Sequence, residues 1–221
     1  MTIDTPREEC GVVGAYLPGS PDSAAARLAF FALFALQHRG QESAGIAAGD
    51  NNTLRNFANM GLVSNVFREE DLDRLPGHIV VGHTRYSTMG SSNLTNVQPI
   101  VSRSPSTELA LAHNGNIINA PDLRQKLSDD FAVNCQGSSD SEVIAHLLAW
   151  APEKDWAGRV AFLHRVLKGA YSLTVATKDQ LVAIRDPLGV RPLCLGRYGN
   201  GWVIASESSA LDHVGAQFMR E

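Results

Sequence analysis

Cys10 is the residue of this sequence best placed to act as a nucleophile. It follows a polar nine-residue segment and precedes Gly-Val-Val-Gly, a run typical of a buried strand. A thiol reacts when a base or a lowered pKa yields its thiolate. The α-amine of a chain, with a pKa of about 7.7–8.0, is such a base when cysteine is the first residue. This chemistry therefore requires removal of residues 1–9. Taken alone, a cysteine heading a strand is more often a buried core residue.

Arg85 and Asp140 offer opposite charges beside two predicted elements. Arg85 ends an apolar strand and is followed by Tyr86-Ser87-Thr88. Its guanidinium can bind a carboxylate through two parallel hydrogen bonds. Asp140 lies in a Ser-Ser-Asp-Ser-Glu segment that precedes a helical pattern. In isolation each has a simpler interpretation: a solvated arginine at a strand end, and an N-cap whose acidic residues complement the helix dipole.

Asn114 and Gly115 follow another apolar strand. Amide hydrolysis passes through a tetrahedral intermediate whose oxyanion needs convergent hydrogen-bond donors. A side-chain amide and a backbone N–H at a glycine are groups of this kind. Asn-Gly is also the strongest short signal for a hairpin turn, so a plain turn is the competing interpretation.

Hydrophobic patterning predicts elements on both sides of these residues. A strand over residues 11–17 is followed by a helix over 24–38, closed by Gly40. Further strands are expected at 43–48, 53–58, 78–85, 97–102 and 108–113, then a short helix opened by Pro121, a helix from Ser139 to about Trp150, a helix over 155–167, and strands at 169–176, 180–186, 192–197 and 201–206. Strand runs separated by paired helices indicate a layered α+β domain.

Composition excludes several classes of protein. The 221 residues are 44% apolar and 19% charged, with a net charge of −4, which gives no footprint for nucleic acid or a membrane surface. The most apolar segment, residues 28–36, is far shorter than the ~20 residues of a transmembrane helix. Three widely spaced cysteines make neither a disulfide framework nor a CxxC metal site, and the histidines lack ligand spacing. We therefore expect a cytoplasmic protein in which Cys135 and Cys194 are inert.

Five ordered blocks carry a resemblance to a known family. ECGVVGAY, LQHRGQESAGI, GHTRYST, LAHNGNI and SSDSE occur in this order from Cys10 onward. Together they resemble the glutamine amidotransferase domains of the amidophosphoribosyltransferases, which are N-terminal-nucleophile hydrolases. The resemblance implies an αββα sandwich of two mainly antiparallel sheets between helices. It also implies that residues 10–221 form one glutaminase domain and that residues 1–9 are a propeptide removed autocatalytically.

The resemblance assigns a role to each candidate residue. Cys10 is the nucleophile, and the oxyanion rests on Asn114 and Gly115. Arg85 binds the α-carboxylate of glutamine and Asp140 its α-ammonium. Three further residues belong to the implied substrate-binding set: Tyr86, Thr88 and Arg39, the last of which the resemblance places near the cysteine. The Asp-Pro-Leu-Gly-Val-Arg-Pro-Leu segment at 186–193 also matches, and we interpret it first as a shaped loop.

The family's second domain, a phosphoribosyltransferase, has no counterpart in this sequence. The partners expected of this chain are therefore glutamine and that absent domain, and a homo-oligomer is left open. No cofactor is expected here, because Mg²⁺ and an iron–sulfur cluster belong to the second domain. In the full-length enzyme the released ammonia would serve 5-phosphoribosylamine synthesis from phosphoribosyl pyrophosphate, the first step of purine biosynthesis. The alternatives are another amidotransferase of this class, of the glucosamine-phosphate-synthase type, and a non-catalytic glutamine-binding domain with unprocessed Cys10.

Overall fold

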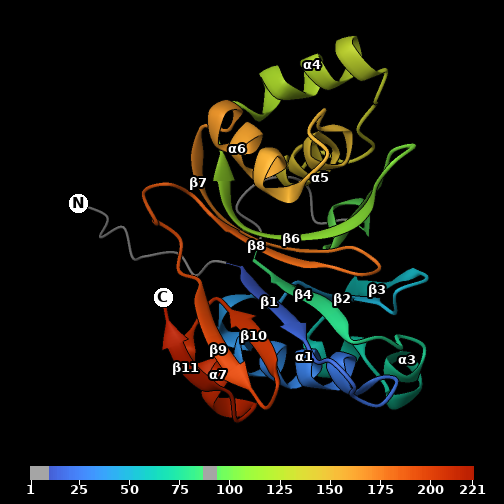
Figure 1. The fold of residues 1–221 in the computed structure, drawn as a ribbon, viewed down its shortest axis with the longest axis vertical. Helices are drawn as coiled ribbons and strands as arrows, with labels where there is room; N and C mark the ends of the chain where they lie inside the picture. The colour runs from blue at the N-terminus through green and yellow to red at the C-terminus, as the bar shows by residue number, and fades with distance from the viewer. Residues whose placement is uncertain (1–9, 87–93) are drawn as a thin grey trace.

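Two stacked β-sheets form the centre of the molecule (Figure 1). The computed structural model describes residues 10–86 and 94–221. The larger sheet has seven strands, in the order β11 (Gln217–Arg220), β9 (Cys194–Tyr198), β10 (Gly201–Ala205), β1 (Gly11–Tyr16), β4 (Ile79–Arg85), β2 (Ser43–Gly49) and β3 (Leu54–Met60). The smaller sheet has four, in the order β5 (Ile100–Arg103), β6 (Glu108–Ile117), β7 (Gly169–Ala176) and β8 (Leu181–Arg185). Neighbouring strands pair antiparallel in both sheets.

Helices cover the outer face of each sheet (Figure 1). Against the larger sheet pack α1 (Ala24–Ala35), α2 (Val63–Val66), α3 (Glu69–Asp73) and α7 (Ser208–His213). Against the smaller sheet pack α4 (Ala120–Phe131), α5 (Asp140–Trp150) and α6 (Trp156–Val166). Two short 3₁₀ turns, η1 (Gln37–Arg39) and η2 (Leu94–Asn96), complete the elements. The predicted αββα sandwich is confirmed.

Side-chain alternation along β1 explains how the layers hold together. Successive residues of a strand point to opposite faces. Val13 and Ala15 join the core beneath the helices, whereas Val12 packs between the sheets with Ala112 and Ile204. A strand between two layers is apolar on both faces, which is why β1 reads as a nearly continuous apolar run.

Three differences from the sequence prediction concern short elements and boundaries. The first helix ends at Ala35, and η1 carries the chain on to Arg39. The prediction omitted six short elements, because each is too brief to show a periodic pattern of apolar residues. They are the two 3₁₀ turns, the helices α2, α3 and α7, and the edge strand β11. Strand β6 runs to Ile117, so the hairpin turn considered at Asn114-Gly115 is wrong.

Within the described ranges, no helix is long and apolar enough to cross a membrane.

Candidate active site

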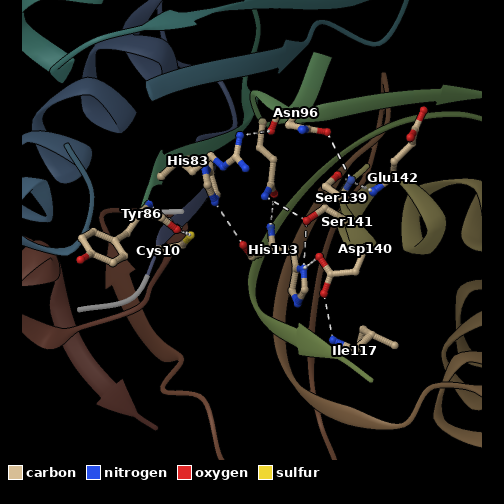
Figure 2. Close-up of polar contacts among 12 residues, drawn as sticks. Cys10, His83, Tyr86, Asn96, His113, Ile117, Ser139, Asp140, Ser141 and Glu142 are labelled. Carbon is tan, nitrogen blue, oxygen red and sulfur yellow. Dashed lines mark hydrogen bonds and ion pairs between the residues drawn. The ribbon is translucent and has the colours of Figure 1, made fainter. Parts of the chain in front are cut away.

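Strand pairing brings Cys10 to the end of β4. Gly11 of β1 lies opposite Thr84 in the antiparallel β1–β4 pair, so the residue before β1 meets the residues that end β4. The Cys10 thiol donates a hydrogen bond to the backbone carbonyl oxygen of Tyr86 at 3.4 Å. It also accepts a hydrogen bond from the backbone nitrogen of Tyr86 at 3.5 Å (Figure 2). These two contacts fix the sulfur beside the carboxyl end of β4.

The surroundings of Cys10 keep its thiol protonated at neutral pH. Burial raises the pKa of the thiol, and the Tyr86 backbone contact and the Arg85 guanidinium offset only part of that effect. Because a protonated thiol is a poor nucleophile, Cys10 needs a base close by. In the described chain its own nitrogen is a peptide amide, which cannot serve.

A small pocket joins the two sheets at this point. Both charged candidates and Gly115 line it together with the cysteine; its lining residues are Cys10, Arg85, Tyr86, Gln98, His113, Gly115, Ser139, Asp140 and Ser141. Arg85 is 3% exposed and donates to the Asn96 backbone carbonyl at 3.3 Å. The large sheet therefore supplies the cysteine and the cation, and the small sheet with α5 supplies the carboxylate.

Asp140 begins α5 and faces the site. Ser139 is the N-cap of this helix, and its hydroxyl accepts from the Glu142 backbone N–H at 3.4 Å, so the capping interpretation of this segment is also correct. The Asp140 Oδ2 atom accepts from the Ile117 backbone N–H at 2.9 Å. Its Oδ1 atom lies 3.8 Å from Nδ1 of His113 (Figure 2). Asp140 is thus a pocket-lining carboxylate rather than the cap itself.

Asn114 and Gly115 lie within β6, opposite Ser172 and Tyr171 of β7. The Asn114 side chain is 1% exposed, and neither its amide nitrogen nor its oxygen has a hydrogen-bond partner among the described residues. Gly115 has a φ of +147°, which L residues rarely adopt, and a Cβ there would lie 2.1 Å from the Ala170 carbonyl oxygen. Asn114 does not line the small pocket, although its neighbours on both sides do.

Arg39 contacts the backbone of the cysteine and not the pocket. Its Nε donates to the Cys10 carbonyl oxygen at 3.2 Å, and its other end forms an ion pair with Glu207. Glu207 precedes α7 and also lies 3.0 Å from Nε2 of His38. The sequence analysis missed Glu207, since nothing local marks a residue 168 positions from its partner. Thr88 lies outside the described residues.

A buried ring of hydrogen bonds links β6 to α5. The Gln98 side-chain oxygen accepts from the His113 backbone N–H at 2.7 Å, and its amide donates to the Ser141 hydroxyl at 3.0 Å. The same hydroxyl lies 3.0 Å from Nδ1 of His113, which closes the ring (Figure 2). Sequence reasoning missed these three positions. The only signal was that His113 and Ser141 belong to recognised blocks, so the site must be held by residues of those blocks beyond the reacting ones.

Two histidines beside the site are neutral. His83 is 0% exposed, and its Nε2 donates to the His113 carbonyl oxygen at 3.1 Å. Burial lowers the pKa of His83 to about 3, and burial lowers the pKa of His113 as well. Neither imidazole therefore carries a charge near Arg85 at neutral pH.

A family model described as a glutamine amidotransferase domain matches residues 83–213, more than half of the chain. The chain belongs to this glutamine amidotransferase family. It is 48% identical over 219 residues to amidophosphoribosyltransferase 3, chloroplastic, of Arabidopsis thaliana, covering 99% of this chain and 40% of that protein. It is 47% identical over 214 residues to an amidophosphoribosyltransferase of Archaeoglobus fulgidus, covering 96% of this chain and 46% of the relative.

A solved structure agrees with the same assignment. Glutamine phosphoribosylpyrophosphate amidotransferase from B. subtilis, complexed with ADP and GMP, matches with a TM-score of 0.86 and 39% identity, over 96% of this chain and 45% of that one. The chain thus spans less than half the length of the relatives it matches. The resemblance recognised in the sequence is confirmed, and the amidotransferase domain is an enzyme domain.

The geometry of the amidotransferase domain suits one type of chemistry. A sulfur, a cation and an anion converge on one pocket, and an unsatisfied buried amide lies next to it. These groups suit the two charged ends of a small zwitterion whose carbonyl carbon faces the sulfur, and the pocket, about 20 Å³ in volume, must widen to admit it. The individual roles assigned to these residues in the sequence analysis stay predictions.

Proposed function

We propose that this domain hydrolyses the side-chain amide of free glutamine to glutamate and ammonia, with Cys10 as nucleophile once residues 1–9 have been removed. The observation that carries the proposal is the shared pocket of Cys10, Arg85 and Asp140, which come from both halves of the sandwich. Membership of the glutamine amidotransferase family supports the same reaction.

Two opposite charges account for selectivity toward a free amino acid. The Arg85 guanidinium binds the α-carboxylate of glutamine, and the Asp140 carboxylate binds its α-ammonium. A glutamine within a peptide has neither charge. A neutral peptide group therefore gains less from the buried guanidinium and carboxylate than the charged ends of free glutamine do, and free glutamine is preferred. Tyr86 lines the same pocket, and Arg39 acts on it only through the Cys10 carbonyl. A substrate-binding role for Thr88 stays a prediction.

The reaction has two covalent steps. The neutral α-amine of Cys10 takes the thiol proton as sulfur attacks the side-chain carbonyl carbon of glutamine, and the oxyanion accepts hydrogen bonds from the Asn114 amide and the Gly115 N–H. The carbon–nitrogen bond then breaks, and the amine returns its proton to the leaving nitrogen, which departs as ammonia. Water, deprotonated by the same amine, attacks the γ-glutamyl thioester. Glutamate leaves, and the thiol is regenerated.

The names of the relatives suggest the wider role. We propose that the ammonia serves 5-phosphoribosylamine synthesis from phosphoribosyl pyrophosphate on a phosphoribosyltransferase domain beyond this chain. The matched relatives carry the amidophosphoribosyltransferase name, which favours this role over that of a glucosamine-phosphate synthase. Mg²⁺ and an iron–sulfur cluster would belong to that other domain. We propose the cytoplasm as the location, on the basis of three free cysteines; a homo-oligomer stays a prediction.

The decisive experiment combines intact mass with ammonia release. Chain with a verified Cys10 N-terminus should release ammonia from saturating glutamine, and Cys10→Ala prepared with the same N-terminus should release none above background. Cys194→Ala, which removes a buried cysteine distant in sequence, is the matched control and should retain activity. If the chain with the verified Cys10 N-terminus bound glutamine in calorimetry without hydrolysing it, the domain would instead be a non-catalytic binding domain.

A further inference from the structure

A second group of chemically active side chains lies outside the pocket. Cys135, in the loop between α4 and α5, lies beside Glu142 and His146 of α5. One ligand atom from each residue lies within 4.8 Å of the other two. Glu142 and His146 are four residues apart, so the helix places both side chains on one face. None of the three residues lines the pocket that contains Cys10.

The three donor types match the preferences of zinc. A thiolate, an imidazole nitrogen and a carboxylate oxygen bind Zn²⁺ at about 2.0–2.3 Å. Donor atoms around a tetrahedral zinc are therefore roughly 3.5 Å apart. The present spacing requires closure of about 1 Å, which rotation of the Cys135 side chain can supply.

Neighbouring groups already orient the ligands. The His146 Nδ1 atom lies 2.8 Å from the Ser102 hydroxyl of β5, and this contact leaves Nε2 directed toward Glu142 Oε1 at 3.8 Å. A histidine that ligates a metal usually donates its other nitrogen to such a group, which fixes the ring. This arrangement is independent of the cysteine and is the feature expected of a prepared nitrogen ligand.

Two backbone N–H groups hold the Glu142 carboxylate in place. Its Oε1 atom accepts a hydrogen bond from the Gln136 backbone N–H at 2.7 Å, and its Oε2 atom accepts one from the Gly137 backbone N–H at 2.9 Å. Each oxygen can accept two hydrogen bonds or one bond and a metal, so Oε1 keeps capacity for a cation.

The guanidinium of Arg124 lies near the cluster but does not contact the oxygen that faces His146. Arg124 lies 3.7 Å from Glu142 Oε2, on the oxygen turned away from His146. Its nitrogens donate to the backbone carbonyls of Gly137 at 2.9 Å and Ser139 at 3.0 Å. Arg124 is thus engaged by the loop and leaves the Oε1 side open.

We propose that Cys135, Glu142 and His146 bind one Zn²⁺-class divalent metal ion, with water as the fourth ligand. Binding releases the thiol proton of Cys135 and ties its loop to α5. That loop runs directly into Ser139 and Asp140, so the ion stabilises the end of α5 that lines the pocket. The inference revises the expectations that Cys135 is inert and that the domain binds no metal, and it does not depend on the proposed hydrolysis.

Titration of the whole chain with Co²⁺ under reducing conditions tests the site directly. We expect one Co²⁺ per chain, with a thiolate-to-cobalt charge-transfer band and the visible bands of a tetrahedral ion, displaced by added Zn²⁺. Cys135→Ser should abolish the charge-transfer band, and His146→Gln should weaken binding at least about tenfold. Cys10→Ala and Cys194→Ala are the matched controls and should keep the spectrum.

Thermal unfolding shows whether each variant is folded and whether zinc stabilises it. Zinc should raise the midpoint of the parent chain and leave that of Cys135→Ser unchanged, since a ligand that binds only the folded state stabilises it. A charge-transfer band that persists in Cys135→Ser, or that disappears in Cys10→Ala, would overturn the assignment. So would the absence of any cobalt–thiolate signal in the folded parent chain.

Discussion

Among single residues, Asn114 and His83 have buried side-chain atoms with no hydrogen-bond partner in the described part of the chain. A buried polar atom left unsatisfied costs about 1–3 kcal/mol. For Asn114 the proposed reaction supplies the missing partner, because the oxyanion of the intermediate accepts from the amide. For His83 the consequence is a buried imidazole that stays neutral.

Replacing Asn114 with alanine should affect the reaction more than the fold. We expect kcat for ammonia release to fall about 10²–10³-fold, because one oxyanion donor is lost. The free energy of unfolding should change little, because relief of the unsatisfied buried amide offsets the cavity that alanine leaves. Steady-state kinetics and urea unfolding of the processed chain measure both quantities. A variant with unchanged kcat and weaker glutamine binding would assign Asn114 to substrate binding instead.

His83 should make the domain sensitive to acid. Its folded pKa of about 3 lies below the ordinary value of 6.5, so between these values the unfolded chain binds a proton that the folded chain does not. Stability therefore falls as the pH is lowered through this window, by about 2 kcal/mol from His83 alone between pH 7 and pH 5.

Urea unfolding at these two pH values checks this expectation. His83→Gln retains a donor for the His113 carbonyl and should lose about 2 kcal/mol less than the parent chain between pH 7 and pH 5. The exposed His213 provides a matched control, His213→Gln, which should behave like the parent. An equal pH dependence in the parent and His83→Gln would contradict the prediction.

At the scale of elements, β6 decides the geometry of the site. Asn-Gly sequences favour a turn, yet β7 pairs with β6 through Ile117 and keeps both residues in the strand. The cost is a glycine at a φ of +147°. The same strand carries His113, whose backbone and ring join the hydrogen bonds to α5. Strand and helix are thus held together where the substrate is expected to bind.

Gly115→Ala should damage both fold and reaction. The added Cβ would lie 2.1 Å from the Ala170 carbonyl, in a backbone conformation that L residues avoid. We expect a loss of more than about 3 kcal/mol in the free energy of unfolding. Gly199 is a matched control, because it has a φ of +55° and nothing lies within 4 Å of its ideal Cβ. Gly199→Ala should cost about 1–2 kcal/mol and leave kinetics unchanged. Equal losses in the two variants would contradict this reasoning.

At the scale of the whole molecule, the site exists only while the two sheets are stacked. Cys10 and Arg85 belong to the large-sheet half, and Gly115 and Asp140 to the small-sheet half. The layer between the sheets contains small and branched side chains, among them Ile79 and Val81 of β4. Because this layer is shared, loosening it at one end should affect the entire sandwich.

Ile79→Ala tests this cooperativity far from the pocket. Ile79 begins β4, six residues before Arg85, and is 0% exposed. We expect a loss of about 2–5 kcal/mol from the lost burial and the cavity. The urea midpoints from ammonia release, far-UV circular dichroism and tryptophan fluorescence should fall together, while kcat in the folded state is kept. A separate early loss of activity would indicate that the halves unfold independently.

The sequence by itself determined the layers of the fold and most of the residues that meet in the pocket. Cys10, Arg85, Gly115 and Asp140 were identified from residue types and ordered blocks, and the pocket unites them. Strand periodicity and the Ser139 cap located most elements, because alternation and capping are local properties of the chain.

Only the tertiary structure decided the remaining features. It extended β6 through Asn-Gly, joined Arg39 to Glu207, closed the hydrogen bonds through Gln98, and set Cys135 beside His146. Most of these features depend on partners that strand pairing and layer packing bring together from distant parts of the chain, and local patterns do not encode them. The residues of the Cys135 cluster are close together in the sequence. The irregular loop that leads into α5 sets their geometry, and such a loop has no periodic pattern of apolar residues from which to predict it.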